Sequence, residues 1–138
     1  MDKALLKEKI LKIFSGKKLA CLATLKDGKP WVRYVMTDSK ELDLYVATAL
    51  TTRKVAEIKK DKHVHLTMGF DQSNPYSPYV QVAGTAEILT DDATKKEFWS
   101  DMLKVYFKGP DDPVYCVIKI TPELIEYWAT MEPEVYIC

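Results

Sequence analysis

The stretch Leu44–Lys60, with the sequence LYVATALTTRKVAEIKK, organises the fold of the whole chain. Its first part, up to Thr48, alternates in polarity and is rich in β-forming residues, whereas its last part has the periodicity of a helix. Arg53 and Lys54 open that helix. A strand that leads into a helix leaves the first helical N–H groups unpaired, and nearby hydroxyls and cations add donors and positive charge. The stretch therefore predicts an anion site that suits a phosphate. The hydroxyl groups around it belong to Tyr45, Thr48, Thr51 and Thr52.

The same residues also have a simpler interpretation. Thr51 or Thr52 is then an ordinary N-cap of the helix, and Arg53 and Lys54 face water, as most basic side chains do. Both interpretations remain open from this stretch alone. The rest of the chain has to decide between them.

Composition limits the classes of protein to which the chain can belong. Its 138 residues predict one domain, 1–138, that buries a core without disulfides or metal. Twenty basic residues balance twenty acidic ones and the pI is near 6.7, so we expect no nucleic-acid partner. The charged first residues do not match a signal peptide, and no apolar run approaches a membrane span of roughly 20 residues. We therefore expect a cytoplasmic protein without a membrane partner. Its three widely spaced cysteines, an odd number without a C-x-x-C pair, fit reduced thiols.

A β-hairpin precedes the central stretch. Leu19–Leu25 is a short apolar run, Asp27 and Gly28 are a strong turn signal, and Trp31–Thr37 alternates. In the second strand Trp31, Arg33, Val35 and Thr37 share one face. Arg33 must reach solvent, a carboxylate or a ligand there, because a buried and unpaired charge costs several kcal/mol.

The pattern of the whole chain predicts about six strands and three helices with short connections. An antiparallel barrel is the economical arrangement, because closure removes the exposed edges of six strands. The predicted helices are 3–15, 52–60 and one that follows the cap residues 90–92, with Phe98, Trp99, Met102, Leu103 and Tyr106 facing inward. The other predicted strands are 42–48, 63–70, 79–89 with a bulge or a close backbone contact at Gly84, 114–120, 124–129 after a turn at 121–123, and a short piece at 134–137.

Familiar catalytic motifs are missing from the sequence. It contains no G-x-S-x-G, P-loop, H-E-x-x-H or strand-linked G-x-G-x-x-G motif. His63 and His65 lie on one face of a predicted strand and form half of a possible metal site, but no further ligand has matching spacing, so we favour a solvated face and predict no metal. If the protein is an enzyme, we expect a bound cofactor to carry the chemistry.

The order of these motifs resembles the pyridoxamine 5′-phosphate oxidase-like flavoproteins, in particular the small general-stress-protein type. The shared order is K-D-G-K-P and R-Y-V-M-T in the hairpin, L-Y-V-A-T in the next strand, and T-T-R-K at the start of a helix. V-A-G-T-A-E, F-W, D-D-P and E-Y-W follow later, so the resemblance covers nearly the whole chain. It implies a mainly β fold, namely a six-stranded antiparallel Greek-key split β-barrel that binds FMN.

The resemblance also implies a site and a partner. In such proteins FMN lies in a cleft between two subunits, so a homodimer is expected, and a small molecule is the substrate. Residues of the second and third strands meet the flavin, and the hydroxyl-Arg-Lys helix start binds its phosphate. An aromatic residue from the partner is an additional contact, although core packing is the alternative role for this residue here. These positions map to Arg33, Val35, Met36, Thr37, Ala47, Thr48, Thr52, Arg53 and Lys54, with Trp99 as the aromatic residue.

One segment departs from the family's authentic oxidases. The end of the chain, EYWATMEPEVYIC, lacks the Arg- and His-bearing segment that holds pyridoxal phosphate, so we do not expect vitamin B6 oxidation. An FMN-dependent oxidoreductase is the leading hypothesis. The alternatives are a non-catalytic flavin-binding sensor or store, a deazaflavin- or haem-binding protein of the same barrel type, and an interaction domain without a cofactor. No catalytic residue is assigned.

Overall fold

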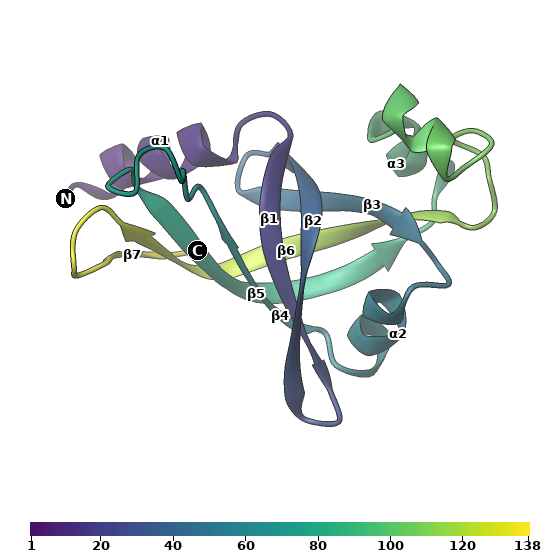
Figure 1. Ribbon diagram of the computed structural model, residues 1–138, viewed down its shortest axis with the longest axis horizontal. Helices are drawn as coiled ribbons and strands as arrows, with labels where there is room; N and C mark the ends of the chain where they lie inside the picture. The colour runs from purple at the N-terminus through teal and green to yellow at the C-terminus, as the bar shows by residue number, and fades with distance from the viewer.

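A computed structural model describes residues 1–138, and it consists of seven strands and a few short helices (Figure 1). The strands are β1 (Lys18–Lys26), β2 (Lys29–Lys40), β3 (Asp43–Ala49), β4 (His63–Met68), β5 (Tyr79–Leu89), β6 (Tyr115–Trp128) and β7 (Glu134–Ile137). The helices are α1 (Lys3–Phe14), α2 (Arg53–Lys60), α3 (Asp92–Glu97) and the 3₁₀ helix η1 (Asp101–Val105).

Six of the strands form a closed antiparallel barrel. They pair in the order β3-β2-β1-β4-β5-β6, and the pairing of β3 with β6 closes the ring. The seventh strand, β7, pairs with the second half of β6. The predicted mainly β fold, a six-stranded antiparallel barrel, is therefore confirmed. In Figure 1, α1 and β7 lie at one end of the barrel, and α2 and α3 lie at the other.

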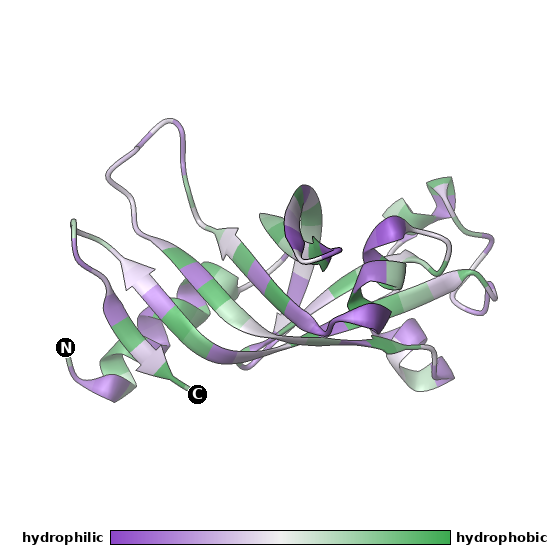
Figure 2. Cartoon of the chain, turned by 90° about the horizontal axis from the view of Figure 1, so that it is seen from below, coloured by the Kyte–Doolittle hydropathy of each residue, from purple (hydrophilic) through white to green (hydrophobic).

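The β1–β2 hairpin forms as its turn residues predict. Asp27 and Gly28 both have positive φ angles, 53° and 76°, as a two-residue hairpin turn requires, and Lys26 pairs with Lys29 across it. Hydrophobic and polar residues alternate along the strands because successive side chains point into and out of the barrel (Figure 2). Helix α1 covers one end of the core with the buried side chains of Leu6, Ile10 and Phe14.

The predicted turn at residues 121–123 is wrong. Residues 115–128 form the single strand β6, and its residues 117–128 pair with β5 over the whole length of β5. The register shifts where Gly84 lies opposite Pro122, so the predicted bulge at Gly84 is confirmed. A Cβ atom at Gly84 would overlap the carbonyl oxygen of Thr121, which explains why glycine fits this position. The turn-forming residues therefore bend a strand and do not end it.

The single helix predicted after residues 90–92 is also wrong in part. The chain forms α3 and η1, separated by Ser100, whose backbone is extended. Phe98 is buried, but Met102 and Tyr106 are 64% and 79% exposed and do not face the core. The interruption at Ser100 changes the helical phase, so a periodicity counted across it places these two side chains on the wrong face.

Candidate functional site

Strands β2 and β3 separate at the barrel end that carries α2 and α3 (Figure 1). The two strands pair only from Asp38 to Lys40 with Asp43 to Tyr45, after which β3 pairs with β6. From Arg33 to Thr37, β2 has β1 on one side and no strand on the other. The backbone on that side of β2 is therefore free to bind the polar edge of a ligand.

A cavity of about 640 Å³ opens at this separation. Its volume is in the range of small-molecule and cofactor sites, which are mostly apolar with a few polar groups. The wall comes from the ends of β2 and β3, from the start of α2, and from the α3–η1 segment. It consists of Lys17, Met36, Asp38, Ala47, Thr48, Ala49, Thr51, Thr52, Lys54, Phe98, Ser100, Met102, Leu103, Tyr106, Phe107 and Val114.

Lys54 is the uncompensated cation of this cavity. Its side chain is partly buried and makes neither an ion pair nor a hydrogen bond with any protein group. Burial, followed by the positive charge of Arg33, holds the pKa of Lys54 below its ordinary value. The other lysine in the wall, Lys17, is paired with Asp38 at 2.8 Å. A partly desolvated ammonium without a carboxylate partner is suited to an anionic ligand.

The start of α2 lies beside Lys54 and has no side-chain cap. Thr52 occupies the N-cap position, but its hydroxyl donates backward to the carbonyl of Ala49 at 2.8 Å. By contrast, Asp2 and Asp91 cap α1 and α3 by accepting backbone N–H groups. Thr52 is therefore the N-cap residue, as one interpretation predicted, but its hydroxyl does not cap the helix. Thr51 is exposed and lines the cavity.

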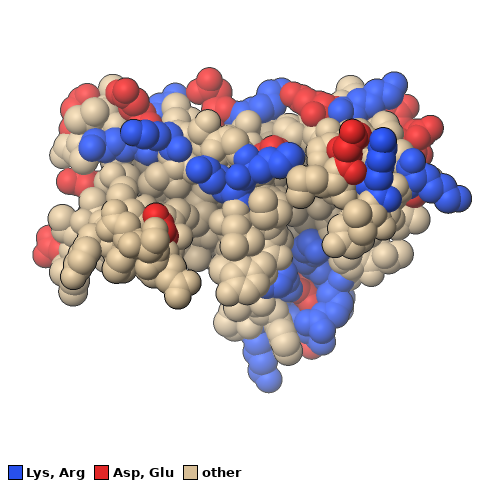
Figure 3. All heavy atoms as spheres, turned by 45° about the horizontal axis from the view of Figure 1, so that its top comes forward, with Lys and Arg blue, Asp and Glu red and all other residues tan.

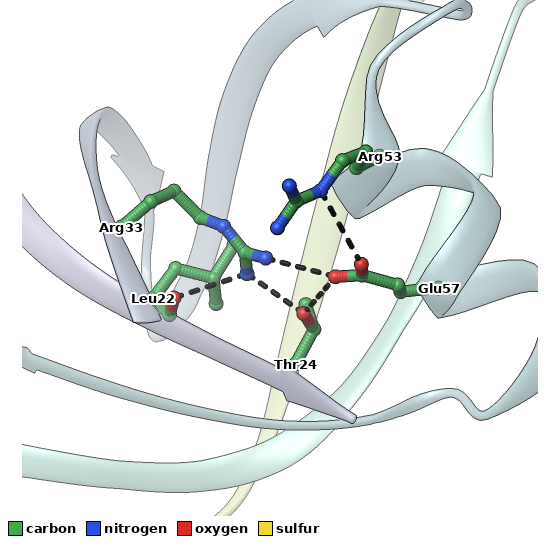
Figure 4. Close-up of polar contacts among 5 residues, drawn as sticks. All are labelled: Leu22, Thr24, Arg33, Arg53 and Glu57. Carbon is green, nitrogen blue, oxygen red and sulfur yellow. Dashed lines mark hydrogen bonds and ion pairs between the residues drawn. The ribbon is translucent and has the colours of Figure 1, made fainter. Parts of the chain in front are cut away.

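Arg33 is held within the protein by three acceptors (Figure 4). Its Nη1 donates to the carbonyl of Leu22 at 3.2 Å and to Oγ1 of Thr24 at 2.7 Å. Its Nη2 pairs with Oε1 of Glu57 at 2.8 Å, and the Thr24 hydroxyl donates to the same carboxylate oxygen at 2.6 Å. The hydrogen bond from Thr24, together with the Arg33 charge, lowers the pKa of Glu57 although burial opposes this shift. Arg33 therefore reaches a carboxylate, one of the three outcomes that the sequence allowed.

Arg53 and Lys54 are consecutive on α2 and therefore about 100° apart around it, and they line different cavities. The Arg53 guanidinium lies 5.1 Å from the ring centre of Trp31, and its Nε is 3.9 Å from Oε2 of Glu57. It lines a separate cavity of about 450 Å³, between α2 and the β1–β2 turn, together with Lys60.

The α3–η1 wall of the cavity is fastened to β6. The hydroxyl of Tyr115 donates to the carbonyl of Lys95 at 2.9 Å, and Nζ of the buried Lys95 donates to the carbonyl of Asp112 at 3.0 Å. Burial raises the pKa of Tyr115 to about 12, so the phenol stays protonated. Trp99 packs edge-on against Tyr115, with 5.5 Å between ring centres.

The structure brings half of the sequence-predicted residues together around the larger cavity. Val35 and Thr37 point into the barrel interior and are buried, Arg33 and Arg53 are engaged by Glu57, and Trp99 lies against its own chain. The residues that line the cavity are Met36, Ala47, Thr48, Thr52 and Lys54.

Sequence reasoning missed Glu57 and the Lys17–Asp38 pair. The spacing of four residues from Arg53 to Glu57 on a helix was the available signal for the first. The pairing of Lys17 with Asp38 joins residues 21 positions apart, and no local pattern indicates it.

An apolar patch covers the outer face of the β1–β2 hairpin, next to the cavity. Leu19, Val32, Tyr34 and Met36 are exposed there, Tyr34 by 74%. Met36 belongs both to this patch and to the cavity wall. On the face seen in Figure 3, charged side chains of both signs lie mainly along the upper part, and the lower left part is mostly uncharged.

The two histidines lie outside the larger cavity. Both are exposed on β4, and Nδ1 of His63 lies 2.8 Å from Oδ1 of Asp61. No three His, Cys, Asp or Glu side chains gather in a way that could hold a metal ion. No helix is long and apolar enough to cross a membrane.

Known proteins resemble this chain over nearly its full length. The family described as "Pyridoxamine 5'-phosphate oxidase like" matches residues 6–138. General stress protein 26 of Bacillus subtilis (strain 168) is 35% identical over 123 residues, which are 89% of this chain and 88% of that protein. The crystal structure of General Stress Protein 26 from Bacillus anthracis str. Sterne is 34% identical, with a TM-score of 0.86 over 96% of this chain and 98% of that one.

More distant structures share the fold alone. One is an F420 reductase, 24% identical with a TM-score of 0.66 over 83% of this chain and 93% of that one. Another is a heme binding protein from Mycobacterium smegmatis, 16% identical with a TM-score of 0.77 over 99% of this chain and 59% of that one. The match over residues 6–138 and the identity to the stress proteins decide the family. The chain belongs to the pyridoxamine 5′-phosphate oxidase-like split-barrel family and is of the general stress protein type.

Proposed function

We propose that the protein binds FMN and is an oxidoreductase that acts on a small molecule. The observation that carries the proposal is Lys54, a partly buried cation without a protein partner at the wall of a cavity of about 640 Å³. Membership of a family named for an oxidase of a phosphate ester supports an anionic cofactor in that cavity. FMN supplies hydride or electron transfer when bound.

The residues of the cavity fit the two ends of FMN. Lys54 and Thr52, with the uncapped start of α2, suit the phosphate because they offer donors and positive charge. Met36, Ala47 and Thr48, beside the unpaired backbone of β2, suit a flat ring with polar edges. Leu103 and Phe107 add apolar surface to the wall of the same cavity.

The proposal includes a homodimer with the cofactor at its interface. The apolar patch of Leu19, Val32, Tyr34 and Met36 is adjacent to the cavity, and Met36 takes part in both. Monomeric proteins seldom leave such a contiguous apolar area in water. A second copy on this patch would bury it and cover the cavity mouth, so the partner completes the site.

Absorption spectroscopy of the purified protein tests the cofactor. A flavin spectrum, with FMN in the supernatant after heat release, is the expected result. For protein isolated without flavin, the test is titration with FMN and with riboflavin, which lacks the phosphate. Replacing both Arg53 and Lys54 by Ala should weaken FMN binding and leave riboflavin binding unchanged. A colourless protein that binds neither flavin would refute the proposal.

A flavin-binding sensor or store is the second candidate. It is favoured by the few acid–base groups in the cavity wall, where Asp38 is already paired with Lys17 at 2.8 Å. Tight flavin binding without turnover across reductants and acceptors would select this function. A haem ligated by His63 or His65 is disfavoured, because the hollow beside them has only about 210 Å³. The absorption spectrum also separates FMN from a deazaflavin.

A further inference from the structure

Glu57 stands between two guanidinium groups behind the anion site. Its side chain is 8% exposed and lies on the second turn of α2. One carboxylate oxygen, Oε1, is shared by Thr24 at 2.6 Å and Arg33 at 2.8 Å. The other, Oε2, faces Arg53 at 3.9 Å (Figure 4).

The two arginines are held with very different strength. Arg33 donates three hydrogen bonds to groups on β1 and α2, one of them to the buried carboxylate of Glu57, so it is fixed. The Arg53 side chain is 65% exposed and meets Glu57 only through the long 3.9 Å contact. Exposed ion pairs of this kind are weak, so Arg53 is free to exchange partners.

We propose that Glu57 is a positioning residue and an internal counter-anion of the site, which fixes Arg33 and competes with a ligand phosphate for Arg53. The inference rests on the proposed phosphate-binding function. Of Arg33, Arg53 and Lys54, only Lys54 has no carboxylate partner. A phosphate therefore binds to Lys54 first. Arg53 reaches the phosphate only by leaving Glu57 and the Trp31 ring.

Glu57→Gln separates the two roles of the carboxylate. The amide oxygen still accepts from Thr24 and Arg33, so α2 stays in place, whereas the competing negative charge is removed. We therefore expect Glu57→Gln to bind FMN about two- to fivefold more tightly, the range set by an exposed ion pair. Riboflavin carries no phosphate, so its affinity should not change.

The experiment compares dissociation constants for FMN and riboflavin, measured by flavin fluorescence. Glu134→Gln is the control, because it changes the net charge equally at the barrel end opposite α2 (Figure 1). Adding Arg53→Met to Glu57→Gln should abolish the gain. Equal or weaker FMN binding relative to riboflavin in Glu57→Gln would overturn the proposal, and an equal loss for both flavins would identify a merely structural residue.

If Glu57→Gln fails to fold, a second comparison tests the proposal. Arg53→Met alone should weaken FMN binding by at most about fivefold, because the arginine exchanges one anion for another, whereas Lys54→Met should weaken it by about tenfold or more. Equal losses would overturn the proposal. Wild-type protein that binds no FMN would overturn the proposed function and this inference together, whereas FMN binding without these differences overturns the inference alone.

Discussion

Replacing Lys54 with Met should weaken FMN binding and stabilise the flavin-free protein at the same time. Met keeps an unbranched side chain that fills the same space, but it has no charge. A hydrogen bond to a charged group contributes about 1.5–3 kcal/mol. Its loss corresponds to a roughly 10- to 150-fold higher dissociation constant for FMN. Riboflavin, without the phosphate, should bind to the variant as it does to wild type.

The stabilisation follows from the surroundings of Lys54 in the free protein. Its ammonium is partly desolvated, has no carboxylate partner, and is repelled by Arg33, which together lower its pKa. Functional sites of this kind are maintained at the expense of stability. A substitution that removes the unfavourable interaction typically raises the free energy of unfolding by about 0.5–2 kcal/mol. Thermal unfolding without flavin should therefore show a melting temperature a few degrees higher for Lys54→Met.

Lys60→Met is the matched control for this experiment. Lys60 lies on the same helix and is exposed, and it lines the cavity on the other side of α2. This variant should change neither the FMN dissociation constant nor the melting temperature appreciably. If Lys54→Met lowers the melting temperature and weakens FMN and riboflavin binding equally, Lys54 acts in packing alone and does not bind the phosphate.

Three further predictions address the pH dependence, the interface and the barrel. As pH rises through the lowered pKa of Lys54, its cationic form is lost. FMN affinity, measured by titration, should therefore fall by up to about tenfold per pH unit. The Lys54→Met variant should lack this pH dependence. Tyr34→Asp should produce a monomer with weaker FMN binding in light scattering and titration, and a dimer with unchanged affinity would place the interface elsewhere. Gly84→Ala should destabilise the barrel by roughly 3 kcal/mol in urea unfolding, because the added methyl group meets the rigid backbone of Thr121. The control is Gly28→Ala, which meets no atom within 4 Å but has a positive φ of 76°, and it should be milder; equal effects would contradict a steric cause.

The barrel could be predicted because its signals are local. The turn at Asp27 and Gly28 and the alternation that follows define a hairpin without reference to the rest of the chain. The error at 121–123 arose because Thr-Pro-Glu is typical of both a turn and a bulge, and only the partner strand distinguishes them. Gly84 supplies the space on that strand, 38 positions away from Pro122 (122 − 84).

The residues of the site were predictable where their position in a strand or helix determines the direction of the side chain. Lys54 and Met36 line the cavity because the strand end and the helix start fix their directions. Arg33 could have reached solvent, a ligand or a carboxylate. Which of these partners it has was not predictable, because Glu57 and Thr24 come from two other elements. A sequence pattern shows that an arginine needs a partner, but the fold decides which one.

The separation of β2 from β3 connects the barrel to the proposed function. Closure through β3 and β6 leaves part of β2 without a neighbour on one side, and an exposed strand edge invites unwanted pairing. Helix α2 lies beside this gap and is joined to β1 and β2 by the bonds of Glu57 to Thr24 and Arg33. These bonds hold the second turn of α2, and Lys54 lies one turn earlier on the same helix, so they also fix its position relative to the free edge of β2. The bonds that hold α2 against the open part of the barrel therefore also orient the proposed phosphate site, and Glu57→Gln keeps these bonds while it removes the competing charge.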